Sequence, residues 1–159
     1  MKNEVKKMLL KVTPNSVYEK YKKFKNNRHV TIYKNDSEFH EYNDQYKKVS
    51  VIIPNYNYEK YIEERVDSIL FQTYPIYELI ILDDKSTDNS VAKIEEIIKK
   101  HSEIAIKFVK NEKNSGSVFS QWQKAFTLAT GDYVWIAEAD DSCNSHFLEN
   151  IMRGFEDED

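Results

Sequence analysis

The stretch VSVIIPNYNYEKYIEERVDSILFQTYPIYELIILDD (residues 49–84) decides the fold. It opens on a short, mostly β-branched run closed by Pro54, which is typical of a strand buried on both faces. Residues 59–72 then repeat apolar side chains at the helical period, and residues 77–84 form a second apolar run. A buried strand, an amphipathic helix and another buried strand predict two parallel strands joined by a crossover helix.

The rest of the chain continues this alternation. We expect Asp88 to be the N-cap of the next helix and Gly131 to end the helix that follows it. The expected elements are a helix at 89–101, a strand at 104–110, a helix at 118–130, a strand at 133–139 and a helix at 145–155. The predicted fold class is therefore α/β, with an open, mainly parallel sheet and helices on both faces, preceded by a short irregular N-terminal extension.

Charge divides the chain into two parts. Residues 1–48 hold 12 Lys/Arg and 6 Asp/Glu, whereas residues 49–159 hold 11 Lys/Arg and 21 Asp/Glu. The first part is a basic extension or linker, in which we expect a short helix at 17–24 and a short strand at 29–34. It is either solvated or in contact with an anionic membrane surface or a partner. The acidic second part is unsuited to nucleic acid and better suited to a divalent cation.

Composition also bears on the compartment. No run approaches the roughly 18 apolar residues of a membrane span, and no signal-peptide core follows Met1. The single Cys143 excludes an internal disulfide framework and a cysteine-based zinc site. We expect a cytoplasmic protein, with peripheral contact at the inner face of the membrane through the basic extension as an open alternative.

Polar and acidic residues follow three of the predicted strands. They are NYNY (55–58), DDKS (83–86) and EADD (138–141), and ligands of open parallel sheets bind beyond the carboxyl ends of the strands. With three glycines in all, the chain has no glycine-rich phosphate loop, so a bound diphosphate would need a cation. Glu138 and Asp140 can project to the same side and hold Mg²⁺ or Mn²⁺. The alternative is that these acids cap the next helix and face water.

Asp83 and Asp84 repeat the pattern at the end of the second strand. An acid at this position often accepts hydrogen bonds from a ribose or a base edge. The alternative is turn chemistry, in which the Asp and Ser side chains of DDKSTDN bond to their own backbone. Two acid pairs at one edge of one sheet favour a ligand site.

These residues resemble family 2 glycosyltransferases, which have the GT-A fold. Residues 49–90 look like the opening of the family, and NEKNSGS with ATGDYVWIAEADD looks like the stretch leading to its DXD motif. The resemblance runs in unbroken order to Asp141. It implies a nucleotide-sugar site made by Pro54, Asn55, Tyr56, Asp83, Asp84, Gly116, Glu138, Ala139 and Asp140.

Individual roles follow from the same resemblance. The 54–56 loop would contact the nucleobase, Asp84 would hold the base or ribose with Asp83 supporting that turn, and Gly116 would line the nucleotide pocket. Asp140 would be the metal ligand that bridges to the donor diphosphate, with Glu138 in place of the motif's first Asp. Asp141 would be an outer acid or an alternative metal ligand.

The chain departs from the family pattern in two places. The helix after NSGS reads VFSQWQKAF where the family often has Arg and Asn, and Lys124 is the candidate replacement cation. Trp122 and Trp135 are assigned to the core or to a pocket wall. The chain also ends at Asp159, soon after the DXD-like motif, so residues 49–159 would be a truncated donor-binding region, with the general base expected beyond the C-terminus.

The resemblance implies transfer of a sugar from a nucleotide-diphospho-sugar to an acceptor hydroxyl in bacterial surface polysaccharide synthesis. The expected donor is a UDP- or dTDP-sugar, the expected acceptor a saccharide or lipid-linked saccharide, and the expected cofactor Mg²⁺ or Mn²⁺. A non-catalytic nucleotide-sugar-binding or interaction module is the alternative. A receiver-like phosphotransfer domain is disfavoured, because PNYNY offers no acid pair after the first strand.

Overall fold

The structure is a computed structural model that describes residues 40–102 and 104–156. The short helix expected at 17–24 and the short strand expected at 29–34 lie outside the described residues, as does most of the basic extension. The described elements are β1 (Val49–Asn55), α3 (Ile62–Leu70), β2 (Glu78–Asp83), α4 (Ser90–Lys100), β3 (Ile106–Lys110), α5 (Val118–Leu128), β4 (Tyr133–Ile136) and α6 (Phe147–Glu156). None of these helices is long and apolar enough to cross a membrane.

The four strands form one parallel sheet in the order β3-β2-β1-β4. Val51 in the middle of β1 pairs with Leu79 of β2 on one side and with Trp135 of β4 on the other. The chain moves outward from β1 to β3 and then returns to the far side of β1. The direction of winding therefore reverses between β1 and β4, and such a switch point is where ligands of open α/β sheets bind.

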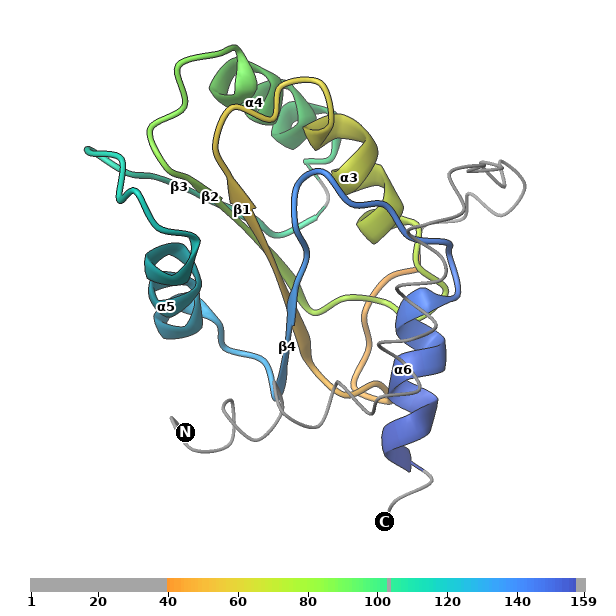
Figure 1. The fold of residues 1–159 in the computed structure, drawn as a ribbon. Coiled ribbons are helices and arrows are strands. Elements are labelled where there is room, and N and C mark those ends of the chain that lie inside the picture. Colours follow the sequence, from red (N-terminus) through yellow and green to blue (C-terminus); the bar gives the residue numbers. More distant parts are fainter. Residues whose placement is uncertain (1–39, 103, 157–159) are drawn as a thin grey trace, which may run out of the picture.

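Helices cover both faces of the sheet, as the sequence predicted (Figure 1). One face packs against α3, α4 and α6 through a core that includes Val51, Ile81 and Ile94. The other packs against α5, where Ala125 meets Ile52 and other sheet residues. Side chains alternate between faces along a strand, so β1 and β2 must be apolar at every position, which is why their sequences read as continuous apolar runs.

Most elements are shorter than predicted, and α3 and β4 are shortened most. The segment before α3 first makes a tight turn, in which the backbone N–H groups of Tyr61 and Ile62 both donate to the Tyr58 carbonyl, at 2.9 and 3.0 Å. β4 ends at Ile136, after which the Ala137 N–H still donates to the Ile52 carbonyl at 2.8 Å. The chain then turns, and the Asp141 N–H donates to the Glu138 carbonyl at 3.2 Å. The acids of EADD therefore lie on a turn beyond the strand.

The predicted N-cap of α4 is one residue too early. The helix begins at Ser90, and Asn89 occupies the N-cap position without a side-chain capping bond. The Asp88 carboxylate nevertheless accepts the Ser90 N–H at 2.9 Å and the Glu59 N–H at 3.0 Å. Asp88 stands one residue before the N-cap, and its carboxylate links the segment after β1 to the start of α4.

Gly131 does not end α5 as predicted. The helix ends at Leu128, with Ala129 at the C-cap in an extended conformation. A Cβ atom on Gly131 would lie 2.7 Å from the Lys48 carbonyl oxygen and 2.7 Å from Ser50 Oγ. The glycine is required because the α5–β4 connection passes directly against the start of β1, where a side chain has no room.

Candidate functional site

The carboxyl ends of β1, β2 and β4 lie at one edge of the sheet and carry the residues that the sequence singled out. Pro54 and Asn55 are buried at the end of β1, where they pair with Leu82 and Asp83 of β2. Tyr56 is the first exposed residue of the loop, with 45% of its surface accessible. The structure therefore places Tyr56, rather than Pro54, where a ligand can reach its side chain.

Asp83 is the centre of a buried hydrogen-bond network. Its carboxylate accepts from Asn55 Nδ2 at 2.8 Å, from the Ser86 N–H at 3.0 Å and from the Ser86 hydroxyl. Asn55 Nδ2 also donates to Ser86 Oγ at 3.1 Å. This is the turn chemistry that the sequence offered as an alternative, and it holds the loops after β1 and β2 together. The Asn55 Oδ1 atom is buried and has no hydrogen-bond partner among the described residues.

Asp84 joins β2 to the loop at 111–117 and to α5. Oδ1 accepts from Asn111 Nδ2 at 2.7 Å, from the Ser115 N–H at 2.9 Å and from Gln121 Nε2 at 2.8 Å, and Oδ2 accepts from Ser115 Oγ at 2.8 Å. A carboxylate that is 5% exposed can be stable there because it receives several hydrogen bonds. In this structure Asp84 holds the 111–117 loop against β2 and α5.

Gly116 and Lys124 belong to the same half of the site. Gly116 has a φ of 64°, and its N–H donates to Asn114 Oδ1 at 2.7 Å. A left-handed backbone favours glycine at this turn. The Lys124 ammonium group donates to Asn111 Oδ1. The predicted replacement cation therefore contacts the loop that surrounds Asp84.

The EADD turn forms the second half of the site. Ala137 and Ala139 are fully buried in the core, while Glu138 is half-buried and Asp140 is exposed. Burial raises the pKa of Glu138, and the charges of Asp140 and Asp141 act in the same direction, against the Trp122 indole and the Arg65 cation. The small alanines anchor the turn while the acids between and after them project from the core.

Sequence reasoning missed two residues of this half and left a third undecided between core and pocket wall. Tyr58 faces the acids. Burial raises the pKa of its phenol, and the negative charges of Asp140, Glu138 and Asp141 raise it further. The Trp122 indole N–H faces Glu138 but is buried without a hydrogen bond of good geometry among the described residues. Tyr58 belongs to NYNY, but its approach to the acids, like that of Trp122 on α5, depends on the fold and not on a local motif.

Arg65 of α3 was missed because a charged residue in a helix usually indicates a solvated face. It is only 3% exposed, and its guanidinium carbon lies 5.2 Å from the centre of the Trp135 ring. Nη1 lies 3.4 Å from Ser68 Oγ and 3.6 Å from Cys143 Sγ, so the cation reaches the segment just after the EADD turn. The sequence did hold one indication that Arg65 is buried. It stands next to Val66, on the apolar face of α3.

The acids fit a metal site that a ligand completes. Within residues 40–102 and 104–156 no group of three or more His, Cys, Asp or Glu side chains converges as a metal centre. Mg²⁺ and Mn²⁺ are commonly bound by one or two carboxylates together with phosphate oxygens and water. The exposed Asp140, whose charge adds to burial in raising the pKa values of Glu138 and Tyr58, has the chemistry of such a partial site.

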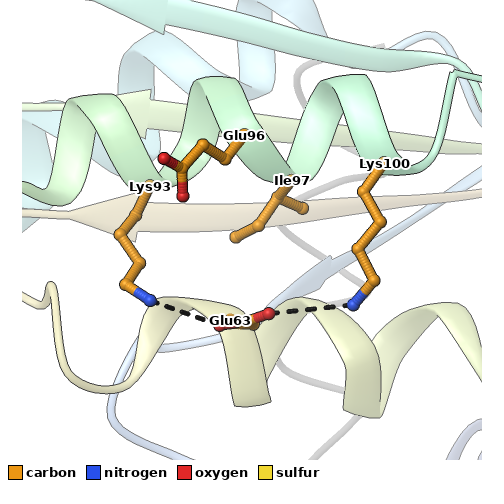
Figure 2. A pocket seen from close by; sticks show the side chains of 5 residues that line it. All are labelled: Glu63, Lys93, Glu96, Ile97 and Lys100. Atoms are coloured by element: carbon orange, nitrogen blue, oxygen red, sulfur yellow. Dashed lines mark hydrogen bonds and ion pairs between the residues drawn. The ribbon is translucent and has the colours of Figure 1, made fainter.

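A surface hollow between α3 and α4 lacks this chemistry (Figure 2). Glu63 lies between Lys93 and Lys100, with nitrogen–oxygen distances of 3.3 and 3.7 Å. All three side chains are substantially exposed, and such ion pairs contribute little to stability. This hollow is a solvated seam between two helices, so the candidate site remains the carboxyl edge of the sheet.

An open parallel sheet with acids gathered at its switch point places this chain among the α/β domains whose ligands bind at the carboxyl ends of the strands. The family model described as "Glycosyl transferase family 2" matches residues 50–159. The chain belongs to this family and has its GT-A fold, as the sequence predicted.

Two curated relatives illustrate the match. An uncharacterized glycosyltransferase of Nostoc is 35% identical over 112 residues, which are 70% of this chain and 34% of the relative. A poly(ribitol-phosphate) beta-glucosyltransferase of Bacillus spizizenii is 36% identical over 103 residues, which are 64% of this chain and 16% of the relative. The chain thus spans about a third or less of the length of these relatives.

Solved structures give the same result. TarS 1–349 of S. aureus in complex with UDP has a TM-score of 0.61 and 34% identity, covering 70% of this chain and 32% of that one. A mannosyltransferase of Pyrobaculum calidifontis in complex with GDP-Man and Mn²⁺ has a TM-score of 0.57 and 28% identity, covering 69% and 32%. Both are complexes with a nucleotide or a nucleotide-sugar.

Proposed function

We propose that this chain is the donor-nucleotide and metal half of a glycosyltransferase that moves a sugar from a nucleotide-diphospho-sugar to an acceptor hydroxyl. The observation that carries the proposal is the edge at the β1/β4 switch point, which brings together the hydrogen-bonded cluster around Asp84 and the EADD turn. A UDP- or dTDP-sugar is the proposed donor. The complexes of TarS with UDP and of the mannosyltransferase with GDP-Man support this class of ligand.

Each half of the edge has a separate proposed role. The loop after β1, with Tyr56 exposed, would receive the nucleobase, while Asp84 and Gly116 shape the neighbouring wall. Asp140, Glu138 and, as an outer acid, Asp141 would hold Mg²⁺ or Mn²⁺. When bound, this ion supplies positive charge that stabilises the departing nucleoside diphosphate. The Mn²⁺ in the mannosyltransferase complex supports a divalent ion here.

The acceptor side of the reaction is part of the same proposal. A carboxylate outside the residues described here would remove the proton from the acceptor hydroxyl, and the acceptor would be a saccharide or a lipid-linked saccharide. The poly(ribitol-phosphate) beta-glucosyltransferase among the relatives supports a role in bacterial surface polysaccharide synthesis. A cytoplasmic location, with contact of the basic extension to the inner face of the membrane, belongs to this proposal.

The test is equilibrium binding of UDP to this chain, with and without Mn²⁺, for the wild type and for Asp140→Asn. We expect Mn²⁺ to tighten UDP binding in the wild type and to have little effect in the variant, because the exposed carboxylate is the proposed link between ion and diphosphate. Asp44→Asn is the matched control, since Asp44 is exposed and precedes β1, away from the carboxyl edge.

Two results would change the proposal. Equal Mn²⁺ dependence in Asp140→Asn and the wild type would remove Asp140 from the metal site. Metal-dependent UDP binding without any hydrolysis of a panel of UDP- and dTDP-sugars would favour the alternative of a non-catalytic nucleotide-sugar-binding module.

A further inference from the structure

The start of α5 carries an aromatic pair, the exposed Phe119 and the partly buried Trp122. Phe119 is 70% exposed, more than any other large apolar side chain in the described part of the chain. Its ring meets the Trp122 ring edge-to-face, with centroids 5.3 Å apart and planes at 74°. Single exposed apolar residues are common, but a rigid aromatic pair offers a ligand a large contact area at little loss of side-chain entropy.

This aromatic pair lies between the two halves of the candidate site. Gln121, next to Trp122, donates to Asp84 Oδ1 at 2.8 Å and to Ser115 Oγ at 3.0 Å, which fixes the start of α5 against Asp84 and the 111–117 loop. Trp122 itself faces Glu138 on the EADD turn. A group attached to a diphosphate at the EADD turn would therefore extend toward the pair.

Two buried polar atoms beside the pair are left unpaired. Gln121 Oε1 and Trp122 Nε1 have no hydrogen-bond partner among the described residues. Unpaired buried polar atoms are rare and cost free energy. Both atoms are buried, so the pair offers a ligand its apolar ring surface, which the C–H face of a sugar matches.

Charge selects among the possible ligands. The ammonium group of Lys124 on α5 donates to Asn111, and the ionisable groups on the EADD turn are carboxylates, with Glu138 facing Trp122 and Asp140 two residues further on. They disfavour an anionic lipid surface or a further phosphate at the pair, whereas neutral hydroxyl groups can donate to them. The nucleobase already has a proposed place near Tyr56, on the loop after β1.

We propose that Phe119 and Trp122 form a platform on which the pyranose ring of the donor sugar packs, with its hydroxyl groups toward Glu138. This inference rests on the proposed function, because it takes the diphosphate to be held at Asp140. It assigns to α5 the recognition of the sugar, as distinct from the nucleotide.

The experiment compares the affinity of UDP with the affinities of UDP-glucose, UDP-galactose and UDP-N-acetylglucosamine, all with Mn²⁺. We expect at least one UDP-sugar to bind the wild type more tightly than UDP. Phe119→Ala should weaken that UDP-sugar by about fivefold, the equivalent of one aromatic contact, and leave UDP within about twofold. Phe119→Tyr should retain the sugar affinity, and Phe119→Leu should not, because the leucine side chain has no ring.

Val118→Ala is the matched control, since Val118 is 42% exposed in the same helical turn and belongs to no part of the platform. Both positions are at the surface, so the variants should fold, which circular dichroism checks. Equal affinity of the wild type for UDP and for every UDP-sugar would overturn the platform, as would an unchanged UDP-sugar affinity in Phe119→Ala. Absence of UDP binding to the folded wild type would overturn the donor site itself, and the platform with it.

Two further arms test other ligands of the same rings. If Phe119→Ala reduces binding to vesicles containing phosphatidylglycerol, the pair contacts lipid and the proposal is wrong. If it reduces binding of a free oligosaccharide but not of any UDP-sugar, the pair serves the acceptor, and the assignment to the donor sugar is wrong.

Discussion

Gly131 shows how a single residue can be required for a reason that its neighbours in sequence do not reveal. It follows α5 and therefore predicts a helix stop, yet its conformation does not need a glycine for that purpose. What excludes a side chain is the approach of the Lys48 carbonyl oxygen and Ser50 Oγ, each 2.7 Å from a Cβ built at this position. These atoms belong to the start of β1, about 80 residues away in sequence.

We expect Gly131→Ala to lower the free energy of unfolding by about 2 kcal/mol, because the added methyl group must push apart the β1 backbone and the α5–β4 connection. Urea denaturation measures this change. Gly154→Ala is the control: a Cβ there meets nothing within 4 Å, and alanine in α6 should raise stability by up to about 1 kcal/mol. Equal effects of the two substitutions would show that backbone flexibility, and not crowding at Gly131, governs the result.

At the scale of elements, Glu78 ties together β1, β2 and the connection between α5 and β4. Its Oε1 accepts from Ser50 Oγ at 2.7 Å, from the Thr130 N–H at 2.7 Å and from Thr130 Oγ1 at 2.9 Å. Ser50 Oγ in turn accepts the Gly131 N–H at 2.8 Å. This network closes the amino edge of the sheet, opposite the candidate site, and leaves the carboxyl edge as the open one.

The pKa of Glu78 gives this network a pH dependence. Burial acts to raise the pKa, but the hydrogen bonds from Ser50 and Thr130 outweigh it and hold the pKa below its ordinary value of 4.5. A lowered folded-state pKa means that the contribution of Glu78 to stability is complete above that value and is lost as the pH falls through the folded-state pKa. Glu78→Gln should therefore destabilise the protein most at neutral pH.

Urea denaturation between about pH 7 and about pH 3 tests this expectation. The stability difference between the wild type and Glu78→Gln should be constant down to pH 4.5 and should shrink below it. Glu41→Gln, at an exposed position before β1, should show a small difference that varies little with pH. A difference that grows as the pH falls would mean that Glu78 is protonated more readily in the folded state.

The elements themselves could be predicted because each is specified locally. β1 and β2 are apolar at successive positions, and α3 and α4 repeat apolar residues at the helical period. The acids of the site were predictable for a related reason: parallel strands end at the same edge, so acids after two strands must come near one another. The boundaries of the elements were predicted less accurately. α3 begins, and β4 ends, where a turn hydrogen bond competes with the regular pattern.

The rest depends on contacts between elements that are distant in sequence. Arg65 is buried because Trp135 and Cys143 cover it, and neither is near it in sequence. Tyr58 and Trp122 join the acids from a loop and a helix whose positions follow from the strand order. Asp84 was identified, but its four hydrogen bonds to Asn111, Ser115 and Gln121 require the folded loop.

At the scale of the whole molecule, the strand order separates the candidate site into two halves. The Asp84 half, made of Asp84 and the 111–117 loop, lies on the β2 and β3 side of the switch point. The EADD turn follows β4, on the other side of β1. A ligand confined to one half contacts a single side, whereas a nucleoside diphosphate with a metal ion would connect the two.

We therefore expect ligands to stabilise the fold in a definite order, measured as the shift in Tm. Uridine alone and Mn²⁺ alone should each shift Tm slightly, and UDP with Mn²⁺ should shift it by more than the sum of the two, because joining two weak sites in one ligand raises the effective concentration of each part. At about 100 times its Kd, UDP with Mn²⁺ should add about 2.7 kcal/mol. In Asp140→Asn that excess should vanish while the uridine shift remains. A uridine shift as large as that of UDP with Mn²⁺ would contradict this expectation. It would place all binding in the Asp84 half and leave the acids of the EADD turn without a role in donor binding.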